Sequence, residues 1–151
     1  MQIVDGLDYI EEVKELIIEY INSLNRDLSF QNINSELNSL KTKYSYPNGR
    51  IITAIVGDKV VGCVAFYKHS SKRCEMKRLY VKKEYRNLKI GNTLVENIIS
   101  LAKKDGYREM VLDTIKPLTS AINLYKKFGF QEIKPYYSNP MPDVIYMKLD
   151  L

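Results

Sequence analysis

The sequence is poor in metal-binding and nucleophilic side chains. Its 151 residues include one histidine, His69, and two cysteines, Cys63 and Cys74. A zinc site needs about four nitrogen, sulfur or carboxylate ligands close together, so we expect no metal. A hairpin turning near residues 69–72 would not place the two cysteines opposite each other, and we expect two reduced, buried thiols. His69 stands in that turn beside two serines, where we expect it to be solvated.

Several well-known motifs are also missing. The chain has neither G-x-x-x-x-G-K-[ST] nor G-x-G-x-x-G, the loops that hold nucleotide phosphates. It has no G-x-S-x-G turn to carry a serine nucleophile. No apolar run approaches the ~20 residues of a membrane span, and the N-terminus lacks a basic region followed by an apolar one. We therefore expect a cytoplasmic protein without a membrane partner.

The charge balance leaves three kinds of partner open. Lysine and arginine outnumber aspartate and glutamate by 23 to 18, which gives a net charge of +5. Such a balance fits a solvated basic surface, a polyanionic ligand or a nucleic acid. The lysines are spread along the chain without an arginine-rich tail. Nucleic acid is therefore the least favoured partner.

The order of predicted elements indicates an α/β domain. Hydrophobic residues make up 45% and charged residues 27%, enough for one core in a single domain over residues 1–151. Helical spacing of apolar residues predicts helices over 8–25, 30–41, 91–104 and 118–128. Strand patterns occupy 50–56, 59–68, 74–81, 108–114, 130–133 and 144–150. We expect a helical N-terminal part, a three-strand meander and a parallel crossover in a mixed sheet.

The turn that follows the strand at 74–81 is a candidate anion site. Ligands of such sheets bind at the carboxyl ends of strands, and the segment "RNLKIGN" lies there. The first amides of a helix have no intrahelical acceptor and attract anions. Arg86 and Lys89 would add charge, and Gly91 would let a ligand approach the backbone. Alternatively, Gly91 only eases packing and Arg86 is a solvated cation.

Four separated segments, in order, resemble the GNAT superfamily of acyl-CoA-dependent N-acetyltransferases. "EMKRLYV" with "EYRNLKIG" is similar to the signature V-x-P-x-x-R-G-x-G-I-G, and "MVLDT" to the family's next strand. "AINLYKKFGF" is similar to A-x-x-L-Y-x-x-x-G-F, and "PYYSNPMPDVIYMKLDL" resembles a bacterial subgroup of small-molecule type. The resemblance implies a mixed, mostly antiparallel central sheet flanked by helices. Asn87 and Lys89 replace two signature glycines, and Leu118 stands where members often carry an asparagine.

The resemblance implies direct acetyl transfer from acetyl-CoA to a primary amine. The implied pyrophosphate site runs along the amides of residues 87–92, and the pantetheine arm lies along residues 79–81. Tyr125 matches the family's proton donor to the departing thiolate. It shares a helical stripe with Ile122 and Phe128, so core packing is its alternative role. The implied cofactor-binding residues are Leu79, Tyr80, Val81, Arg86, Asn87, Leu88, Lys89, Ile90, Gly91, Asn92 and Tyr125.

Glu75 is the candidate general base, at a position where some members carry a glutamate. With Lys77 and Arg78 it places three ionisable residues in one central strand, a local conflict that often marks a site. A structural ion pair at Glu75, or a water relay without a single base, is the alternative. The expected acceptor-binding residues are Tyr20, Glu75, Tyr137 and Asn139, although aromatics in the Pro-rich loop could equally anchor that loop.

Three functional alternatives remain open at this point. A small-molecule amine acceptor predicts a narrow pocket, whereas a protein or peptide acceptor predicts an open groove. A non-catalytic module that binds acyl-CoA is a third alternative, motivated by the replaced glycines. Many members of the family form dimers, so a homodimer is an open expectation.

Overall fold

The computed structural model describes residues 1–28 and 32–151. Seven strands in these residues form one sheet in the order β1-β2-β3-β4-β5-β7-β6. Neighbouring strands are antiparallel except β4 and β5, which are parallel. The expected mixed, mostly antiparallel sheet is therefore confirmed. The strands are β1 (Gln2–Asp5), β2 (Gly49–Val56), β3 (Lys59–Lys68), β4 (Arg73–Val81), β5 (Glu109–Ile115), β6 (Gln131–Ile133) and β7 (Val144–Asp150).

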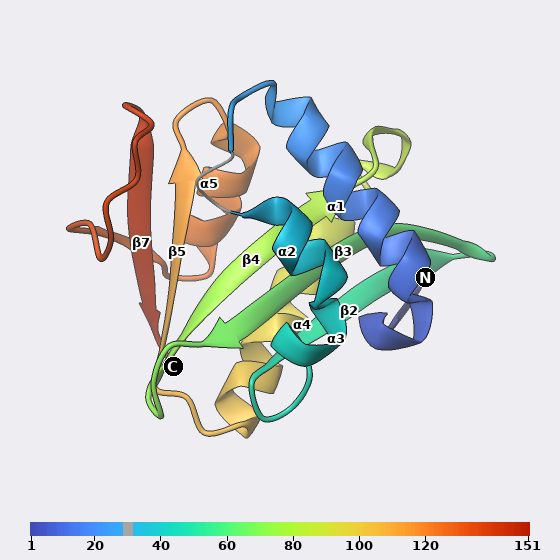
Figure 1. Cartoon of the computed structure of the whole chain (residues 1–151), viewed down its shortest axis with the longest axis horizontal. Helices are drawn as coiled ribbons and strands as arrows, with labels where there is room; N and C mark the ends of the chain where they lie inside the picture. The colour runs from blue at the N-terminus through green and yellow to red at the C-terminus, as the bar shows by residue number, and fades with distance from the viewer. Residues whose placement is uncertain (29–31) are drawn as a thin grey trace.

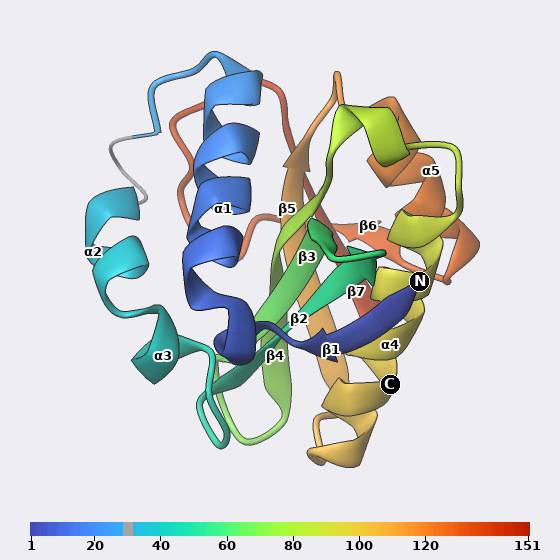
Figure 2. The ribbon, with the colours of Figure 1, turned by 90° about the vertical axis from the view of Figure 1, so that its right-hand side faces the viewer.

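Helices cover both faces of this sheet (Figures 1 and 2). On one face lie α1 (Ile10–Leu24), α2 (Ile33–Asn38) and α3 (Leu40–Lys43), and on the other lie α4 (Ile90–Lys104) and α5 (Thr119–Lys127). Short 3-10 turns, η1 (Gly6–Tyr9) and η3 (Lys83–Tyr85), precede α1 and α4. Each face has its own apolar core, one built on Val13 and Leu16 of α1 and one on Leu94 and Ile98 of α4.

Three of the four predicted helices are confirmed, and the fourth is divided. The segment predicted as one helix over 30–41 contains α2 and α3, separated at Ser39. Phe30, which that prediction counted among its apolar residues, lies outside the described residues. Cys63 and Cys74 are both free and buried, as expected. Cys63 pairs with Tyr80 and Cys74 with Lys68 across β3 and β4, so the cysteines do not face each other.

The N-terminal segment departs from its prediction. The sequence analysis expected a helical start, but residues 2–5 form the edge strand β1 against β2. Four residues are too few for strand periodicity to stand out, and the pairing depends on β2, which lies about fifty residues away in sequence. Gly6 then passes close to Ile51, where an added Cβ would lie 3.2 Å from its side chain.

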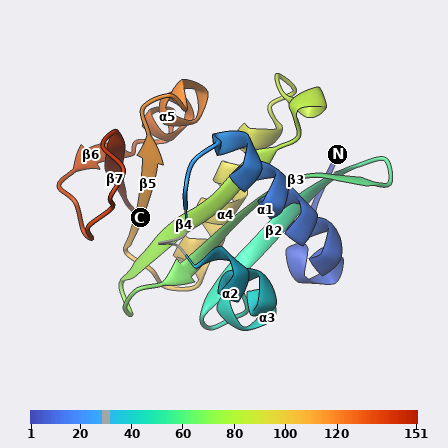
Figure 3. The same cartoon turned by 45° about the horizontal axis from the view of Figure 1, so that its top comes forward.

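The sheet divides between β4 and β5. Within the described residues, the two strands pair at three positions: Arg73–Glu109, Cys74–Met110 and Glu75–Val111. Beyond these pairs they diverge, as Figures 1 and 3 show. The register of β4 against β3 also shifts beyond Lys77, and Arg78 has a left-handed backbone with φ 63°. On its β5 side, the second half of β4 therefore borders a cleft, while its other edge still pairs with β3.

Candidate functional site

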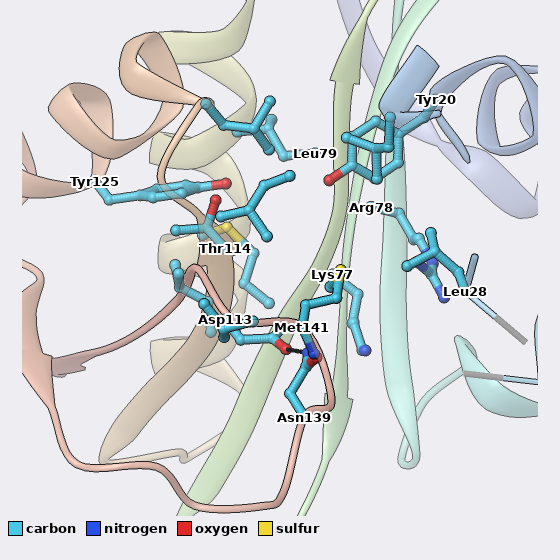
Figure 4. Close-up of a pocket in the computed structure, with 16 residues that line it drawn as sticks. Tyr20, Leu28, Lys77, Arg78, Leu79, Asp113, Thr114, Tyr125, Asn139 and Met141 are labelled. Atoms are coloured by element: carbon cyan, nitrogen blue, oxygen red, sulfur yellow. Dashed lines mark hydrogen bonds between the residues drawn. The ribbon is translucent and has the colours of Figure 1, made fainter. Parts of the chain in front are cut away.

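A small cavity of about 60 Å³ lies in the cleft between β4 and β5 (Figure 4). A water molecule needs roughly 10–15 Å³ of such space, so the cavity has room for only a few. Its walls come from segments that are far apart in sequence. They are β4 (76–79), β5 (112–115), α1 and the residues after it (Tyr20, Leu24, Leu28), α5 with its N-cap (Leu118, Tyr125), the loop before β7 (Asn139, Met141) and the start of β7 (Val144).

Tyr125 combines the two roles that the sequence left open. Its side chain is 7% exposed, and its ring packs on Phe130 with ring centres 5.7 Å apart. Its hydroxyl points into the cleft (Figure 4). Burial raises the pKa of Tyr125, and the negative charge of Asp113 adds to this effect. The hydroxyl therefore keeps its proton near neutral pH and can donate a hydrogen bond into the cleft.

The turn before α4 keeps a glycine-like backbone without two of the glycines. Asn87 has φ 67° and Lys89, the residue preceding the helix, has φ 61°. Both angles are left-handed, a region that costs a residue with a side chain roughly 1–2 kcal/mol. These are the two positions where the signature quoted above carries glycine. The turn therefore has left-handed backbone angles at both positions, although neither residue is glycine.

Gly91 is not required by the protein's own packing. A Cβ added there would lie 3.7 Å from Leu124 and 3.9 Å from Val81, which are ordinary contacts. Its φ is not among the positive values that favour glycine. The interpretation that Gly91 serves strand–helix packing thus loses its support. The bare Cα leaves room for a ligand to approach the backbone closely.

The rest of the expected cofactor segment lies beside this turn. Leu79 lines the cavity near Tyr125 (Figure 4). Arg86 donates from Nε to the carbonyl of Val81 over 3.0 Å, and its guanidinium lies 5.5 Å from the ring centre of Tyr80. Arg86 therefore closes the end of β4 and is not only a solvated cation. The structure thus brings the end of β4, the start of α4 and Tyr125 together at one end of the cleft.

Glu75 lies outside the residues that line the cavity. It is 2% exposed, and its Oε1 accepts hydrogen bonds from Tyr67 (2.7 Å) and from Nε2 of His69 (2.8 Å). Tyr136 donates to Oε2 over 3.1 Å, and the Lys77 ammonium lies 3.6 Å away. Burial favours the neutral acid, but the hydrogen bond from His69 and the charge of Lys77 outweigh it, so the pKa of Glu75 is lowered. Its carboxylate is fully engaged by neighbouring donors.

His69 differs in part from its expectation. It lies in the turn between β3 and β4 and is exposed as a residue. Its ring nevertheless turns inward to bind Glu75, so it is not only a solvated turn residue. The sequence gave no sign of this contact, because the hairpin brings positions 69 and 75 together only once its register is known.

A buried ion pair holds the bulge of β4. Arg78 is 7% exposed and donates to Glu36 of α2 from Nε (2.7 Å) and Nη2 (3.1 Å). Lys43 of α3 lies 2.9 Å from the same carboxylate. Burial works against the charge of Glu36, but Arg78 and Lys43 lower its pKa to about 2. The sequence analysis did not find this pair, whose members are separated by 42 positions.

Two of the expected acceptor residues meet on an aspartate that the sequence analysis missed. Tyr137 donates to Oδ2 of Asp113, and Nδ2 of Asn139 donates to the same oxygen over 3.2 Å. Asn139 and Tyr20 line the cavity, whereas Tyr137 is not a lining residue and contacts the wall through Asp113. Asp113 also lines it, and its charge is the only acidic one inside the apolar strand "MVLDT". That isolated carboxylate was the sequence feature that could have identified Asp113 as a site residue.

One ion pair joins the two loops at the mouth of the cleft. Arg26, after α1, contacts Asp143, before β7, with Nη1–Oδ1 2.6 Å and Nη2–Oδ2 2.7 Å. The bidentate geometry is the strong form of this interaction. The hydrogen bond to the partner raises the pKa of Arg26 and lowers that of Asp143. We call this pair the clasp. It links two segments 117 positions apart.

Among residues 1–28 and 32–151, no three His, Cys, Asp or Glu side chains are grouped so that they could hold a metal ion. In the same residues, no helix has the length and apolarity needed to cross a membrane.

Comparison with known proteins gives consistent matches. The Acetyltransferase (GNAT) family is matched over residues 15–130. An uncharacterized N-acetyltransferase of Schizosaccharomyces pombe is 44% identical over 146 residues, which cover 94% of this chain and 88% of that protein. A GNAT-family acetyltransferase structure from Staphylococcus aureus has a TM-score of 0.82 at 27% identity and covers 99% and 98% of the two chains. A GNAT-family structure from Elizabethkingia anophelis with acetyl-CoA bound has a TM-score of 0.64 at 25% identity, covering 85% and 87%.

Proposed function

The chain belongs to the acetyltransferase (GNAT) family, and from that premise we propose that it transfers an acetyl group from acetyl-CoA to a small primary amine. The observation that carries this proposal is the cleft at the split between β4 and β5, with the Tyr125 hydroxyl directed into it. We further propose one catalytic domain over residues 1–151, located in the cytoplasm and able to form a homodimer. Its likeness to a bacterial small-molecule subgroup also stays a proposal, because the S. pombe relative is eukaryotic.

The cleft offers acetyl-CoA two kinds of backbone contact. The edge of β4 beyond Glu75 has no β5 partner in the described residues, so residues 79–81 can pair with an extended pantetheine arm. The first amides of α4 have no intrahelical acceptor and would hold the pyrophosphate, and the bare Cα of Gly91 would permit its close approach. The related structure with bound acetyl-CoA supports this choice of cosubstrate. Lys89 adds positive charge at the same turn.

The reaction forms an N–C bond and breaks the C–S bond of the thioester. An alkyl amine has a pKa of ~10, so only about one molecule in a thousand is neutral and nucleophilic at pH 7. The developing oxyanion is stabilised by a backbone amide in the 79–81 segment. The amine loses one proton to water before attack and a second after it, and the departing thiolate takes up one.

We propose that Tyr125 assists this departure by hydrogen bonding. A thiol has a pKa of ~8.5, whereas the pKa of Tyr125 is raised above the ordinary value of a tyrosine. Full transfer of the tyrosine proton to sulfur would therefore be uphill. A hydrogen bond from its hydroxyl still lowers the energy of the leaving thiolate.

The position of Glu75 favours the water relay over a direct base. Glu75 lies outside the cavity lining, with both carboxylate oxygens occupied. We propose that it fixes Lys77 and Tyr136, while water in the cleft carries the proton of the amine. Glu75 thus acts as a positioning residue for these two side chains.

The shape of the cleft supports a small acceptor over a peptide. The cavity measures about 60 Å³, and α1 and the loop carrying Asn139 and Met141 wall it in. The clasp between Arg26 and Asp143 ties these two walls together. A peptide acceptor would need an open groove across the same mouth.

A turnover assay with a matched variant tests the proposal. Acetyl-CoA is incubated with a panel of small primary amines and with peptides, and both free thiol and acetylated product are measured. We expect amine-dependent thiol release that falls in Tyr125→Phe but persists in Tyr46→Phe, a change at an exposed tyrosine. Binding of acetyl-CoA without turnover in either form would instead indicate a non-catalytic acyl-CoA-binding module, and transfer only to peptides would reverse the choice of acceptor.

A further inference from the structure

Asp113 presents a carboxylate to the cavity without a partner cation. It lines the cavity, and its Oδ2 accepts from Tyr137 and Asn139. Both donors are neutral. Among residues 1–28 and 32–151, no lysine, arginine or histidine forms an ion pair with Asp113, and Oδ1 has no hydrogen-bond partner there. The carboxylate is half-buried. A charge in such a place is stabilised when a ligand supplies the opposite charge.

The other charges on the cavity wall are compensated. Lys77 lies 3.6 Å from Glu75, and Arg78 is bonded to Glu36 over 2.7 Å. The carboxylate of Asp113 is thus the one unbalanced charge on the described wall. The charge of Asp113 acts across the cleft. Burial is the main cause of the raised pKa of Tyr20 and of Tyr125, and the negative charge of Asp113 raises both further. The two hydroxyls point into the same space (Figure 4).

The remaining wall is apolar where the acceptor would extend away from the thioester. Leu24 and Leu28 stand on one side, and Met141 and Val144 on the other. Arg26 and Asp143 neutralise each other in the clasp beside this wall. Lys116 lies next to them: its backbone amide donates to the carbonyl of Asp143, and its charge helps to lower the pKa of Asp143. A second ammonium on the acceptor would therefore meet a cation beside this wall.

Resting on the proposed function, we propose that the acceptor is a monocationic primary amine on a short apolar stem, with its ammonium bound by Asp113. An α-amino acid fits poorly, because its carboxylate would lie beside that of Asp113 and would have to draw Lys77 away from Glu75. A diamine fits poorly too, because its second ammonium would enter an apolar wall. The bound ammonium then loses its proton to cleft water before attack.

Acceptors that differ in their charged groups test this assignment directly. Steady-state kinetics compare 3-methylbutylamine, leucine (the same stem with a carboxylate) and 1,4-diaminobutane. We expect kcat/KM for the monoamine to exceed that for either of the others at least about tenfold. In Asp113→Asn we expect KM for the monoamine to rise roughly tenfold to a hundredfold, with a smaller change in kcat, because a charged hydrogen bond is lost. The melting shift with acetyl-CoA alone should be unchanged.

Two controls separate charge from loop support. Asp58→Asn makes the same change in the exposed turn between β2 and β3 and should leave all constants unaltered. Tyr137→Phe removes a donor from Asp113 but keeps the charge, and it should change KM less than about threefold. An equal effect of Tyr137→Phe and Asp113→Asn would overturn the assignment, since loop anchoring would then explain both.

The remaining outcomes also test the assignment of Asp113. Equal or better use of leucine would show that Lys77 recognises a carboxylate, and preference for the diamine would show a second anionic subsite. Either result overturns this inference while leaving acetyl transfer intact. If the wild-type protein acetylates no amine at all, the proposed function falls and the inference falls with it.

Discussion

The two walls of the cleft are held in different ways. The wall that we propose to face acetyl-CoA, the acetyl-CoA wall, consists of the end of β4, the turn before α4 and the first turn of that helix, all within residues 79–92. The acceptor wall is assembled from side-chain pairs between distant segments: Arg78–Glu36, Asp113–Tyr137 and Arg26–Asp143. One wall is set by local backbone conformation, and the other by ion pairs and hydrogen bonds across the fold.

This difference has a physical consequence for adaptation. Backbone amides recognise a phosphate without regard to the side chains around them, so the first wall tolerates Asn87 and Lys89 in place of glycines. The second wall recognises its ligand by particular side chains. Under the proposed function, we therefore expect a change of acceptor to need substitutions only on the second wall.

The largest effect is expected from breaking the acceptor wall at its buried ion pair. Glu36→Gln leaves the guanidinium of Arg78 buried without a full counter-charge, and we expect the free energy of unfolding to fall by about 3–5 kcal/mol. Urea denaturation measures it. The matched change Glu84→Gln, at an exposed position, should be neutral. A loss below about 1 kcal/mol in Glu36→Gln would show that the pair does not hold the bulge.

The same pair predicts an acid-dependent loss of stability. The pKa of Glu36 is lowered from 4.5 to about 2 in the folded protein. A lowered folded pKa contributes stability that is complete above the unfolded pKa and is lost as the pH falls toward the folded one. Wild-type unfolding free energy should therefore decrease between about pH 5 and pH 2, and this contribution should be absent in Glu36→Gln. Parallel pH profiles for the two proteins would contradict the assignment.

Much of the acetyl-CoA wall could be predicted from sequence, because its signals are local. The segment "RNLKIGN" lies at the predicted strand–helix junction, and the spacing of Leu94, Ile98 and Ala102 identifies the helix that follows. The motif that contains Tyr125 pointed to a residue that lines the cavity in the structure, and its role in catalysis stays a prediction. The acceptor wall was found only in part, because Tyr137 and Asn139 gain their role from Asp113 across more than twenty positions. Glu36 gave no local sign, since a carboxylate in a short polar helix usually faces water.

The next prediction concerns the hydroxyl that spans the two walls. Tyr125→Phe keeps the ring in its packing against Phe130 but removes the hydrogen-bond donor. We expect kcat to fall by roughly a hundredfold with little change in the KM for acetyl-CoA. The melting temperature without ligand should stay within a few degrees. An unchanged kcat would mean that the hydroxyl takes no part in the departure of the thiolate.

A smaller effect should distinguish packing from ligand contact at Gly91. Gly91→Ala should leave the unfolding free energy unchanged or raise it by up to ~1 kcal/mol, because the new Cβ meets only ordinary contacts. Affinity for acetyl-CoA should nevertheless fall about tenfold, which isothermal titration calorimetry can measure. Lost stability with full affinity would restore the packing explanation.

The smallest expected effect concerns the left-handed turn itself. Lys89→Gly relieves the backbone at φ 61° and should raise the unfolding free energy by about 0.5–1 kcal/mol. Lys89→Ala keeps the unfavourable backbone and should not. Both remove the positive charge and should weaken acetyl-CoA binding a few-fold, with the effect shrinking at high salt. Equal stability of the two variants would contradict a left-handed backbone at Lys89.

The most direct test of the central claim is a thermal melt with and without acetyl-CoA. At a ligand concentration a hundredfold above Kd, binding adds ~2.7 kcal/mol to the folded state. For a domain of this size we expect the melting temperature to rise by roughly 5 to 11 °C, with no comparable rise for ATP. That result would show that the folded protein binds acetyl-CoA, as the proposed function requires. The absence of a shift at millimolar acetyl-CoA would contradict the proposed acetyl transfer and leave only the fold.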